Sequence, residues 1–346
     1  MRRTGILILL LILLAIPVDA MELTAPTVPA VAEDFMVSEH ENLMDGIRQI
    51  LREAVGHIRP DIKEASRVCL GIIGVAMLVS LLRIFPAGVE KSTDLAGVVA
   101  VSVMFLSTAG ALIDLGAETV MQVSAYGKLL LPVMAAALAS QGGITVSTAL
   151  YTVTAAFDAV LSSLISKLLL PLLYLFVAIA VAHRATGEGL LKSMLDGIKW
   201  LMTWLLKTIL YVFTGFISIT GVISGPTDAA ALKAAKLTIS GLVPVVGGIL
   251  SDASEAVIVS AGVVKNAMGM YGLFAVLAIW MDPFLRIGTH YLMLRFTGAI
   301  CSIFGSKGVS NLIQDFAAVM GFLLAMTGSV CLMILISTVC FMRGVM

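Results

Sequence analysis

The chain has 346 residues, of which 59% are hydrophobic and 13% charged, and its formal net charge is zero. A typical soluble domain is about 25% charged, so this composition favours a protein that has a lipid bilayer as its solvent. Zero net charge offers no overall field for nucleic acid, and no polar stretch is long enough to enclose a soluble catalytic core. We therefore expect an all-α polytopic membrane protein that binds no nucleic acid.

Residues 1–20 have the pattern of a cleaved signal peptide. Two arginines precede an apolar run from Ile6 to Ile16, and the small residue Ala20 follows. This run of about 11 residues is shorter than the roughly 20 that span a bilayer. We predict cleavage after Ala20, which leaves residue 21 on the extracytoplasmic side. A retained first transmembrane helix is the alternative.

Residues 21–67 are the longest polar stretch before the membrane region, and we predict an extracytoplasmic amphipathic-helix segment there. Ser38 and Glu41 have capping-box spacing, and Pro60 is expected to end the helix. Apolar residues recur on one helical face, at Leu43, Ile47, Ile50, Leu51, Ala54, Val55 and Ile58. This face must pack against the membrane domain, the bilayer surface or a partner protein.

From residue 68 to residue 346, long apolar runs predict a polytopic transmembrane domain. We expect about nine helices with a range of about 7–10, at 68–85, 95–113, 119–139, 145–165, 168–182, 207–223, 256–281, 284–304 and 316–341. Pro132 and Pro171 interrupt two of these runs. The positive-inside rule assigns the basic loop 183–207 to the cytoplasm, and this count puts the end of the chain after Cys340 there too.

Residues 183–206 are predicted to form a cytoplasmic interfacial helix. Charged and polar side chains follow one face, at Glu188, Lys192, Asp196, Lys199, Thr203 and Lys207, and apolar residues fill the others. Trp200 and Trp204 lie alongside, and such a two-faced helix is typical of the membrane surface. Two interpretations stay open: a connector resting on lipid, or a docking face for a cytoplasmic partner formed by Lys192, Asp196 and Lys199.

Several ionisable residues fall within predicted membrane segments, where such groups are costly and usually face protein or water. Asp282 and Pro283 suit a helix N-cap and first turn, and Arg286, His290 and Thr297 then share one side, with Arg295 on the other. His290 is a candidate proton carrier or a packing residue. The same question arises for Lys128, Asp158 and Lys265, for which a Lys–Asp pair between helices is the simplest structural solution.

The region 221–255 is rich in small residues and in helix breakers, and we predict a broken-helix or re-entrant element there. Small residues let helices approach closely in lipid, and interrupted backbone at membrane depth must be buried in protein or line a cavity. A lining role and a packing hinge are both open. The candidate packing or lining residues are Gly221, Gly225, Pro226, Lys233, Ala234, Lys236, Pro244, Gly247, Gly248 and Asp252.

Soluble-enzyme chemistry is absent from the sequence. It contains no Walker loop, HExxH or GxSxG motif. The four cysteines, Cys69, Cys301, Cys331 and Cys340, lie in apolar segments without CxxC spacing and are expected to be small core residues. We therefore expect no catalytic residues, cofactor or metal.

The same region also carries a resemblance. The run Gly-Val-Ile-Ser-Gly-Pro-Thr-Asp-Ala-Ala-Ala-Leu-Lys-Ala-Ala-Lys at 221–236 and the run Leu-Val-Pro-Val-Val-Gly-Gly-Ile-Leu-Ser-Asp-Ala at 242–253 resemble the signature of the stage III sporulation protein AE family of endospore-forming bacteria. The resemblance covers roughly residues 65–346 and is most specific at 221–265. The polar segment at the N-terminus is shorter than in that family.

This resemblance implies a function that composition does not. Such proteins are taken to be the permease-like membrane core of a transenvelope channel apparatus that links the mother cell to the engulfed forespore. A secretion-type ATPase and ring-forming proteins are the partners that it implies, and the mother-cell membrane around the forespore is the location. The alternative is a stand-alone secondary transporter with a substrate site at the membrane midplane, although the chain shows no second copy of the 221–253 pattern.

Overall fold

The structure is a computed structural model in which residues 25–33, 35–36, 43–82, 90–242, 247–303 and 307–343 are described. Side chains are described over most of these helices but not over 220–262. The predicted signal peptide at 1–20 and the capping-box residues Ser38 and Glu41 lie outside the described residues, so both stay predictions.

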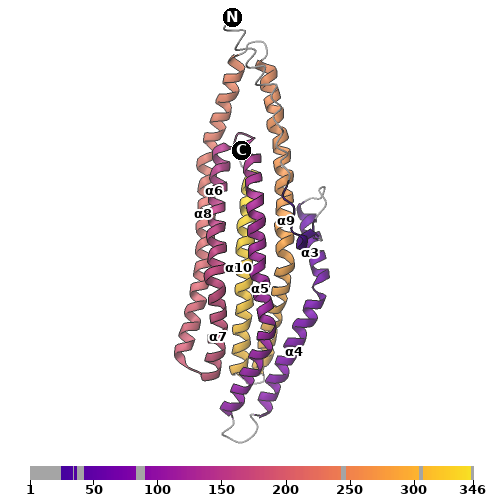
Figure 1. The fold of residues 1–346 in the computed structure, drawn as a ribbon, viewed down its shortest axis with the longest axis vertical. Helices are drawn as coiled ribbons and strands as arrows, with labels where there is room; N and C mark the ends of the chain where they lie inside the picture. The colour runs from indigo at the N-terminus through magenta and orange to yellow at the C-terminus, as the bar shows by residue number, and fades with distance from the viewer. Residues whose placement is uncertain are drawn as a thin grey trace.

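Every regular element among the described residues is a helix, which confirms the all-α prediction. They are α2 (Ala30–Glu33), α3 (Leu43–His57), α4 (Arg59–Leu82), α5 (Glu90–Ala139), α6 (Ile144–Leu164), the π-helix η1 (Ile165–Leu169), α7 (Leu170–Thr186), α8 (Gly189–Leu242), α9 (Gly247–Ile303) and α10 (Lys307–Arg343). In apolar surroundings only a helix satisfies all the backbone hydrogen bonds of a single segment. The long helices run up and down along one axis and form an elongated bundle (Figure 1).

The last helix, α10, lies at the centre of this bundle and packs against α5, α6, α7, α8 and α9 (Figure 1). Its Leu312, Phe316, Met320 and Ile334 are fully buried. The ring of Phe316 stacks on that of Phe105 from α5, with centroids 3.8 Å apart. Side chains of α10 therefore fill the axis of the described bundle.

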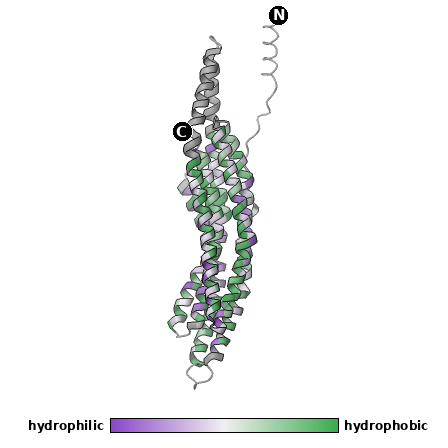
Figure 2. Cartoon of the chain, turned by 90° about the vertical axis from the view of Figure 1, so that its left-hand side faces the viewer, coloured by the Kyte–Doolittle hydropathy of each residue, from purple (hydrophilic) through white to green (hydrophobic). Residues whose placement is uncertain are grey.

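The outer surface of the bundle is largely apolar. Much of the ribbon in Figure 2 has the green colour of hydrophobic residues. Large apolar side chains such as Leu70, Val103, Met121, Tyr211 and Phe296 are more than 60% exposed. A soluble monomer rarely exposes so much contiguous apolar surface. Lipid tails would cover these side chains without cost, which agrees with the composition.

Six helices of the described residues are long and apolar enough to cross a membrane, so the predicted number of about nine is not confirmed. They are 59–82, 92–139, 144–186, 189–219, 265–303 and 308–343. Three of them each contain two of the predicted spans. Asp114, Lys167 and Asp282 fall between predicted spans. In the structure, Asp114 lies inside α5 and Asp282 inside α9, and Lys167 lies in the π turn η1 that joins α6 to α7. A single charged residue does not end a helix when its side chain has a partner or can extend to water.

These helices are longer than a bilayer requires. At 1.5 Å per residue, the 50 residues of α5 extend for about 75 Å, whereas the hydrocarbon core of a membrane is about 30 Å thick. The bundle therefore has to project well beyond the hydrocarbon layer on at least one side.

The number of crossings also changes the predicted placement of the C-terminus. If each of the six helices crosses once, the end of α10 and the α7–α8 turn lie on opposite sides of the membrane, and Figure 1 shows them toward opposite ends of the bundle. The nine-span prediction put the end of the chain after Cys340 and the 183–207 segment both in the cytoplasm. With six crossings, the end of the chain and the 183–207 segment cannot both lie in the cytoplasm.

Three prolines lie within these long helical segments without ending them. Pro132 lies inside α5 and Pro283 inside α9. Pro171 follows the π-helical turn η1, where the Leu170 N–H donates to the Ile165 carbonyl five residues earlier. One wide turn of this kind is a common adjustment in long helices.

The N-terminal amphipathic helix α3 packs on the membrane domain of its own chain. Its main neighbour is α9, and Ile50 and Ala54 of the predicted apolar face are fully buried. Leu51 and Val55, at 43% and 50% exposure, remain at the edge. The predicted helix end near Pro60 is confirmed, because α3 ends at His57 and α4 begins at Arg59.

Candidate functional site

The most connected polar site joins three helices around one carboxylate near the α7–α8 turn. Asp315 of α10 accepts from Nε and Nη2 of Arg184 at 3.1 and 2.8 Å, both at Oδ2, and from Nζ of Lys199 at 3.0 Å at Oδ1. The Asp315 side chain is only 5% exposed, against 22% for Arg184 and 35% for Lys199. Two cations therefore hold one buried carboxylate, and the cluster ties α7, α8 and α10 together. We call these three residues the Asp315 cluster.

Neighbouring residues help to position Lys199 and Arg184 in the Asp315 cluster. The Lys199 ammonium lies 5.3 Å from the centre of the Phe176 ring, a cation–π distance. Gly187 forms the tight turn just before α8 with a φ of +75°, which a residue with a side chain rarely adopts. The turn places the start of α8 back against the end of α7, so Arg184 and Lys199 reach the same carboxylate.

This geometry changes the predicted docking face. Lys192 and Asp196 are exposed, but Lys199 is turned into the bundle and bound to Asp315. The segment is also not a helix of its own, because 183–186 ends α7 and 189–206 begins the long α8. Leu195 is buried at 3%, as the two-faced pattern requires. Whether this segment lies along a membrane surface or receives a cytoplasmic partner stays a prediction.

A second polar site links α9 to the start of α4. Nε of Arg286 is 2.9 Å from Oδ2 of Asp282 and 3.8 Å from Oδ2 of Asp61. Nδ1 of His290 is 3.0 Å from the Arg286 carbonyl oxygen, and its buried Nε2 has no hydrogen-bond partner. The structure thus places His290 beside an ion pair, and its role as a proton carrier or a packing residue stays a prediction.

The helix start predicted at Asp282 and Pro283 is wrong, since both residues lie inside α9. The carboxylate that suggested an N-cap instead forms an ion pair with Arg286 one turn later. The predicted division of the faces agrees with the structure. His290 and Thr297 are buried, and Arg295 is exposed on another side, over the Tyr291 ring.

The three isolated ionisable residues have different surroundings. Asp158 is 1% exposed and its Oδ2 accepts from the Ser124 hydroxyl at 2.6 Å, whereas Lys128 is exposed. Among the described residues, no ion pair within 4.0 Å joins Lys128 to Asp158. Lys265 is buried at 6% on α9. The expected Lys–Asp pair is therefore replaced by a hydroxyl–carboxylate hydrogen bond between α5 and α6.

The candidate lining region is divided between two helices. Gly221, Gly225, Pro226, Lys233, Ala234 and Lys236 lie in α8, and Gly247, Gly248 and Asp252 begin α9. Helix α8 continues through Pro226, so the break predicted at that residue is absent. Pro244 lies outside the described residues, as do the side chains of the others. Their packing or lining role stays a prediction.

Four residues of these sites were not candidates from the sequence: Arg184, Asp315, Asp61 and Ser124. Asp315 carried a usable signal, because it is a lone acid near the start of the last apolar run, and a buried acid needs a cation. Its partners lie more than 100 residues away, at 131 for Arg184 and 116 for Lys199. No local spacing reports such a pairing.

No group of three or more His, Cys, Asp or Glu side chains suited to a metal ion occurs within the described residues. Cys69, Cys301 and Cys331 are buried free thiols and Cys340 is partly buried. The four cysteines are core residues, as predicted.

The described residues form an all-α bundle held together by polar contacts between apolar helices, six of which are long and apolar enough to cross a membrane. Residues 31–344 match the stage III sporulation protein AE family. The chain therefore belongs to the stage III sporulation protein AE family, and the resemblance noted at 221–253 is confirmed. The name of that family refers to stage III of sporulation.

One curated relative is the stage III sporulation protein AE of Bacillus subtilis (strain 168). It is 23% identical over 225 residues, which are 65% of this chain and 56% of that protein. The match thus spans little more than half of the relative's length. No solved structure matches the chain.

Proposed function

We propose that this chain is the permease-like membrane-core subunit of the sporulation transenvelope channel apparatus between mother cell and forespore. Its location would be the mother-cell membrane around the forespore. The observation that carries the proposal is the family match over residues 31–344, on a bundle with six described helices that are long and apolar enough to cross a membrane. A secretion-type ATPase and ring-forming proteins are the partners we propose.

The length of the helices supports a role in an envelope-spanning assembly. A bundle based on helices of 50 residues and more extends beyond a single hydrocarbon core. The protein therefore has helical surface outside the lipid on which other subunits can pack. A simple transporter needs no such extension.

The filled axis of the bundle favours a subunit over the stand-alone transporter. Side chains of α10 such as Phe316 and Ile334 occupy the centre, so one chain supplies packed helices rather than an axial path. Transporters of the broken-helix type have unwound segments at their substrate site. In the described residues, α5, α8 and α9 run without unwinding, apart from the π turn η1 between α6 and α7.

Deletion of the gene in the source bacterium tests the proposal. We expect sporulating cells to complete engulfment and then lose forespore-specific gene expression and viable spores, with recovery when the gene is restored. The transporter alternative predicts something different: the chain alone, reconstituted in liposomes, moves a small solute. Normal forespore expression in the deletion strain contradicts the proposed function.

A further inference from the structure

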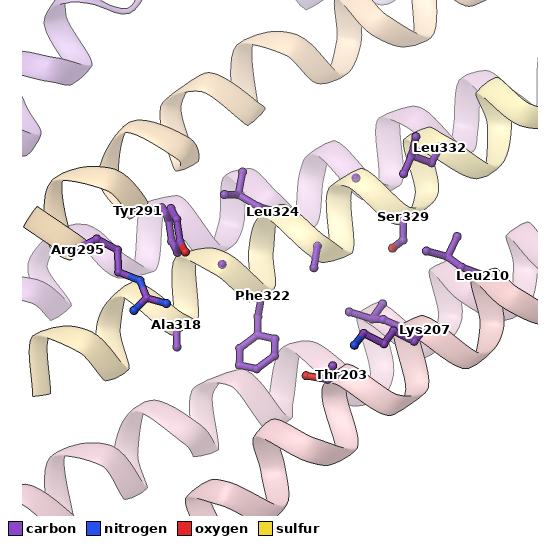
Figure 3. A pocket seen from close by; sticks show the side chains of 14 residues that line it. Thr203, Lys207, Leu210, Tyr291, Arg295, Ala318, Phe322, Leu324, Ser329 and Leu332 are labelled. Carbon is purple, nitrogen blue, oxygen red and sulfur yellow. The ribbon is translucent and has the colours of Figure 1, made fainter. Parts of the chain in front are cut away.

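A cavity of about 500 Å³ lies between α8, α9 and α10 (Figure 3). It begins about one turn beyond the Asp315 cluster, because its lining residues Thr203 and Ala318 follow Lys199 and Asp315 on the same helices. Its volume is within the range of small-ligand sites, roughly 300–1,000 Å³. Small residues of α10, including Gly321, Ala325 and Gly328, form one wall and leave the space between the helices open. The cavity is therefore a consequence of the α10 sequence.

Two cations without a carboxylate partner border this cavity. Lys207 and Arg295 are both exposed, and the cavity wall contains no acidic residue. Among the described residues neither makes an ion pair within 4.0 Å, unlike Arg184, Lys199 and Arg286. An apolar cavity bordered by positive charge is complementary to a ligand that has an anionic group and an apolar part.

Two of the three hydroxyl groups in the cavity wall, those of Thr203 and Ser329, are already used within their own helices, and the third belongs to Tyr291. Thr203 donates to the Lys199 carbonyl at 2.8 Å, and Ser329 donates to the Met326 carbonyl at 2.8 Å. They leave Lys207 and Arg295 as the strong donors for a bound group.

Aromatic residues of α8 indicate where the cavity lies relative to the membrane surface. Trp200 and Trp204 are 65% and 49% exposed, and their rings stack with centroids 6.0 Å apart. Exposed tryptophans on a membrane helix mark the headgroup level. Lys207 follows Trp204 by three residues, about 4.5 Å along the helix, so its ammonium is within reach of that level.

The cavity changes from polar to apolar along its length. In Figure 3, Arg295 lies at one end, Lys207 and Thr203 are near the middle, and Leu210 and Leu332 lie at the other end. A headgroup at the cationic part would direct its chains along the leucines. This order matches the two parts of a phospholipid.

The geometry points to a binding site for one acidic phospholipid, with its phosphate between Lys207 and Arg295 and an acyl chain along Leu210 and Leu332. Basic pockets between membrane helices commonly hold acidic headgroups. Such a lipid would contact α8, α9 and α10. Its phosphate would supply the negative charge that no carboxylate supplies in this cavity, as Asp315 does at the neighbouring cluster.

Native mass spectrometry of the full chain, purified in detergent, tests this site. The probe is dioleoyl phosphatidylglycerol, compared with dioleoyl phosphatidylcholine. We expect one retained phosphatidylglycerol per chain, and binding about 30-fold weaker in the double variant Lys207→Gln/Arg295→Gln, since each cation contributes roughly fivefold. The matched control Lys167→Gln/Lys192→Gln removes two exposed lysines outside the cavity and should bind as the unchanged chain does.

Two further arms separate the lipid from other occupants. Ala325→Phe fills the apolar part of the cavity without changing its charge and should also release the lipid. That result would show that the protein binds the acyl chain of the lipid as well as its headgroup. Inorganic phosphate should not displace it. Equal retention of both lipids, unchanged binding in the double variant, displacement by phosphate alone, or a dimer that dissociates in the cavity variants would each overturn the proposal.

Discussion

Arg184 and Asp315 lie 131 residues apart in the sequence and form a two-donor ion pair, with both guanidinium nitrogens within 3.1 Å of the same carboxylate oxygen. Lys199 occupies the other oxygen at 3.0 Å. The pair fixes the end of α7 to α10 at the point where the chain turns back into α8. It is the strongest polar restraint on the arrangement of these helices in the described part of the chain.

We predict that Asp315→Asn destabilises the protein by about 2–3 kcal/mol. Removal of one partner from a buried ion pair leaves unpaired charge and costs roughly 3–5 kcal/mol, and the partial exposure of Arg184 and Lys199 reduces that cost. The measurement is the midpoint of thermal unfolding in detergent together with the protein level in membranes.

Asp196→Asn is the matched control, because Asp196 is exposed on α8 and should change stability little. A triple variant, Arg184→Met/Lys199→Met/Asp315→Leu, should recover most of the loss, since a buried ion cluster can be replaced by apolar side chains. Equal stability of Asp315→Asn and Asp196→Asn would show that the cluster restrains nothing.

A second prediction compares two glycines. A Cβ at Gly272 of α9 would be 2.7 Å from both methyl groups of Leu130, which is fully buried on α5. Gly272→Ala should therefore cost about 1–3 kcal/mol through overpacking. At Gly215, which has no atom within 4 Å of an added Cβ, the same change should be neutral or stabilise α8 by up to about 1 kcal/mol.

Unfolding midpoints of both variants in the same detergent measure this difference. The close approach of α5 and α9 predicts opposite or clearly unequal shifts. A neutral Gly272→Ala would mean that the two helices are further apart than in the structure.

The third prediction concerns the number of crossings. Single cysteines at Ser140, Glu188 and Arg343, all exposed positions, can be labelled with a membrane-impermeant maleimide in a cysteine-free background. Six crossings place Ser140 and Arg343 on one side and Glu188 on the other. Nine spans at the boundaries predicted from hydropathy place all three on the same side, and that labelling pattern would reject the six-helix arrangement.

Hydrophobic periodicity predicted the helical class and the direction of individual faces, and Pro60 predicted a helix end close to the boundary between α3 and α4. Leu195 is buried and Lys192 exposed because the α8 pattern has the helical period. These features depend on residues within a few turns of each other, so a single sequence contains the information.

The ends of helices and the partners of polar side chains were harder to predict from the sequence. Asp282 with Pro283 has the local signature of a helix start, but a long membrane helix tolerates both once Arg286 binds the carboxylate. The same reason explains why two predicted spans can fall within one continuous helix, as in α5. The partners of Asp315 and Asp158 belong to other helices, and only the packed bundle brings them together.

The central claim, that this chain is a core subunit of a sporulation assembly, is tested most directly by purification of a tagged copy from the membranes of sporulating cells. The account predicts that a secretion-type ATPase and ring-forming proteins copurify with it in constant ratio, and that they are lost when the tagged chain is expressed in growing cells. A chain that purifies without these proteins from cells with normal forespore development would contradict it.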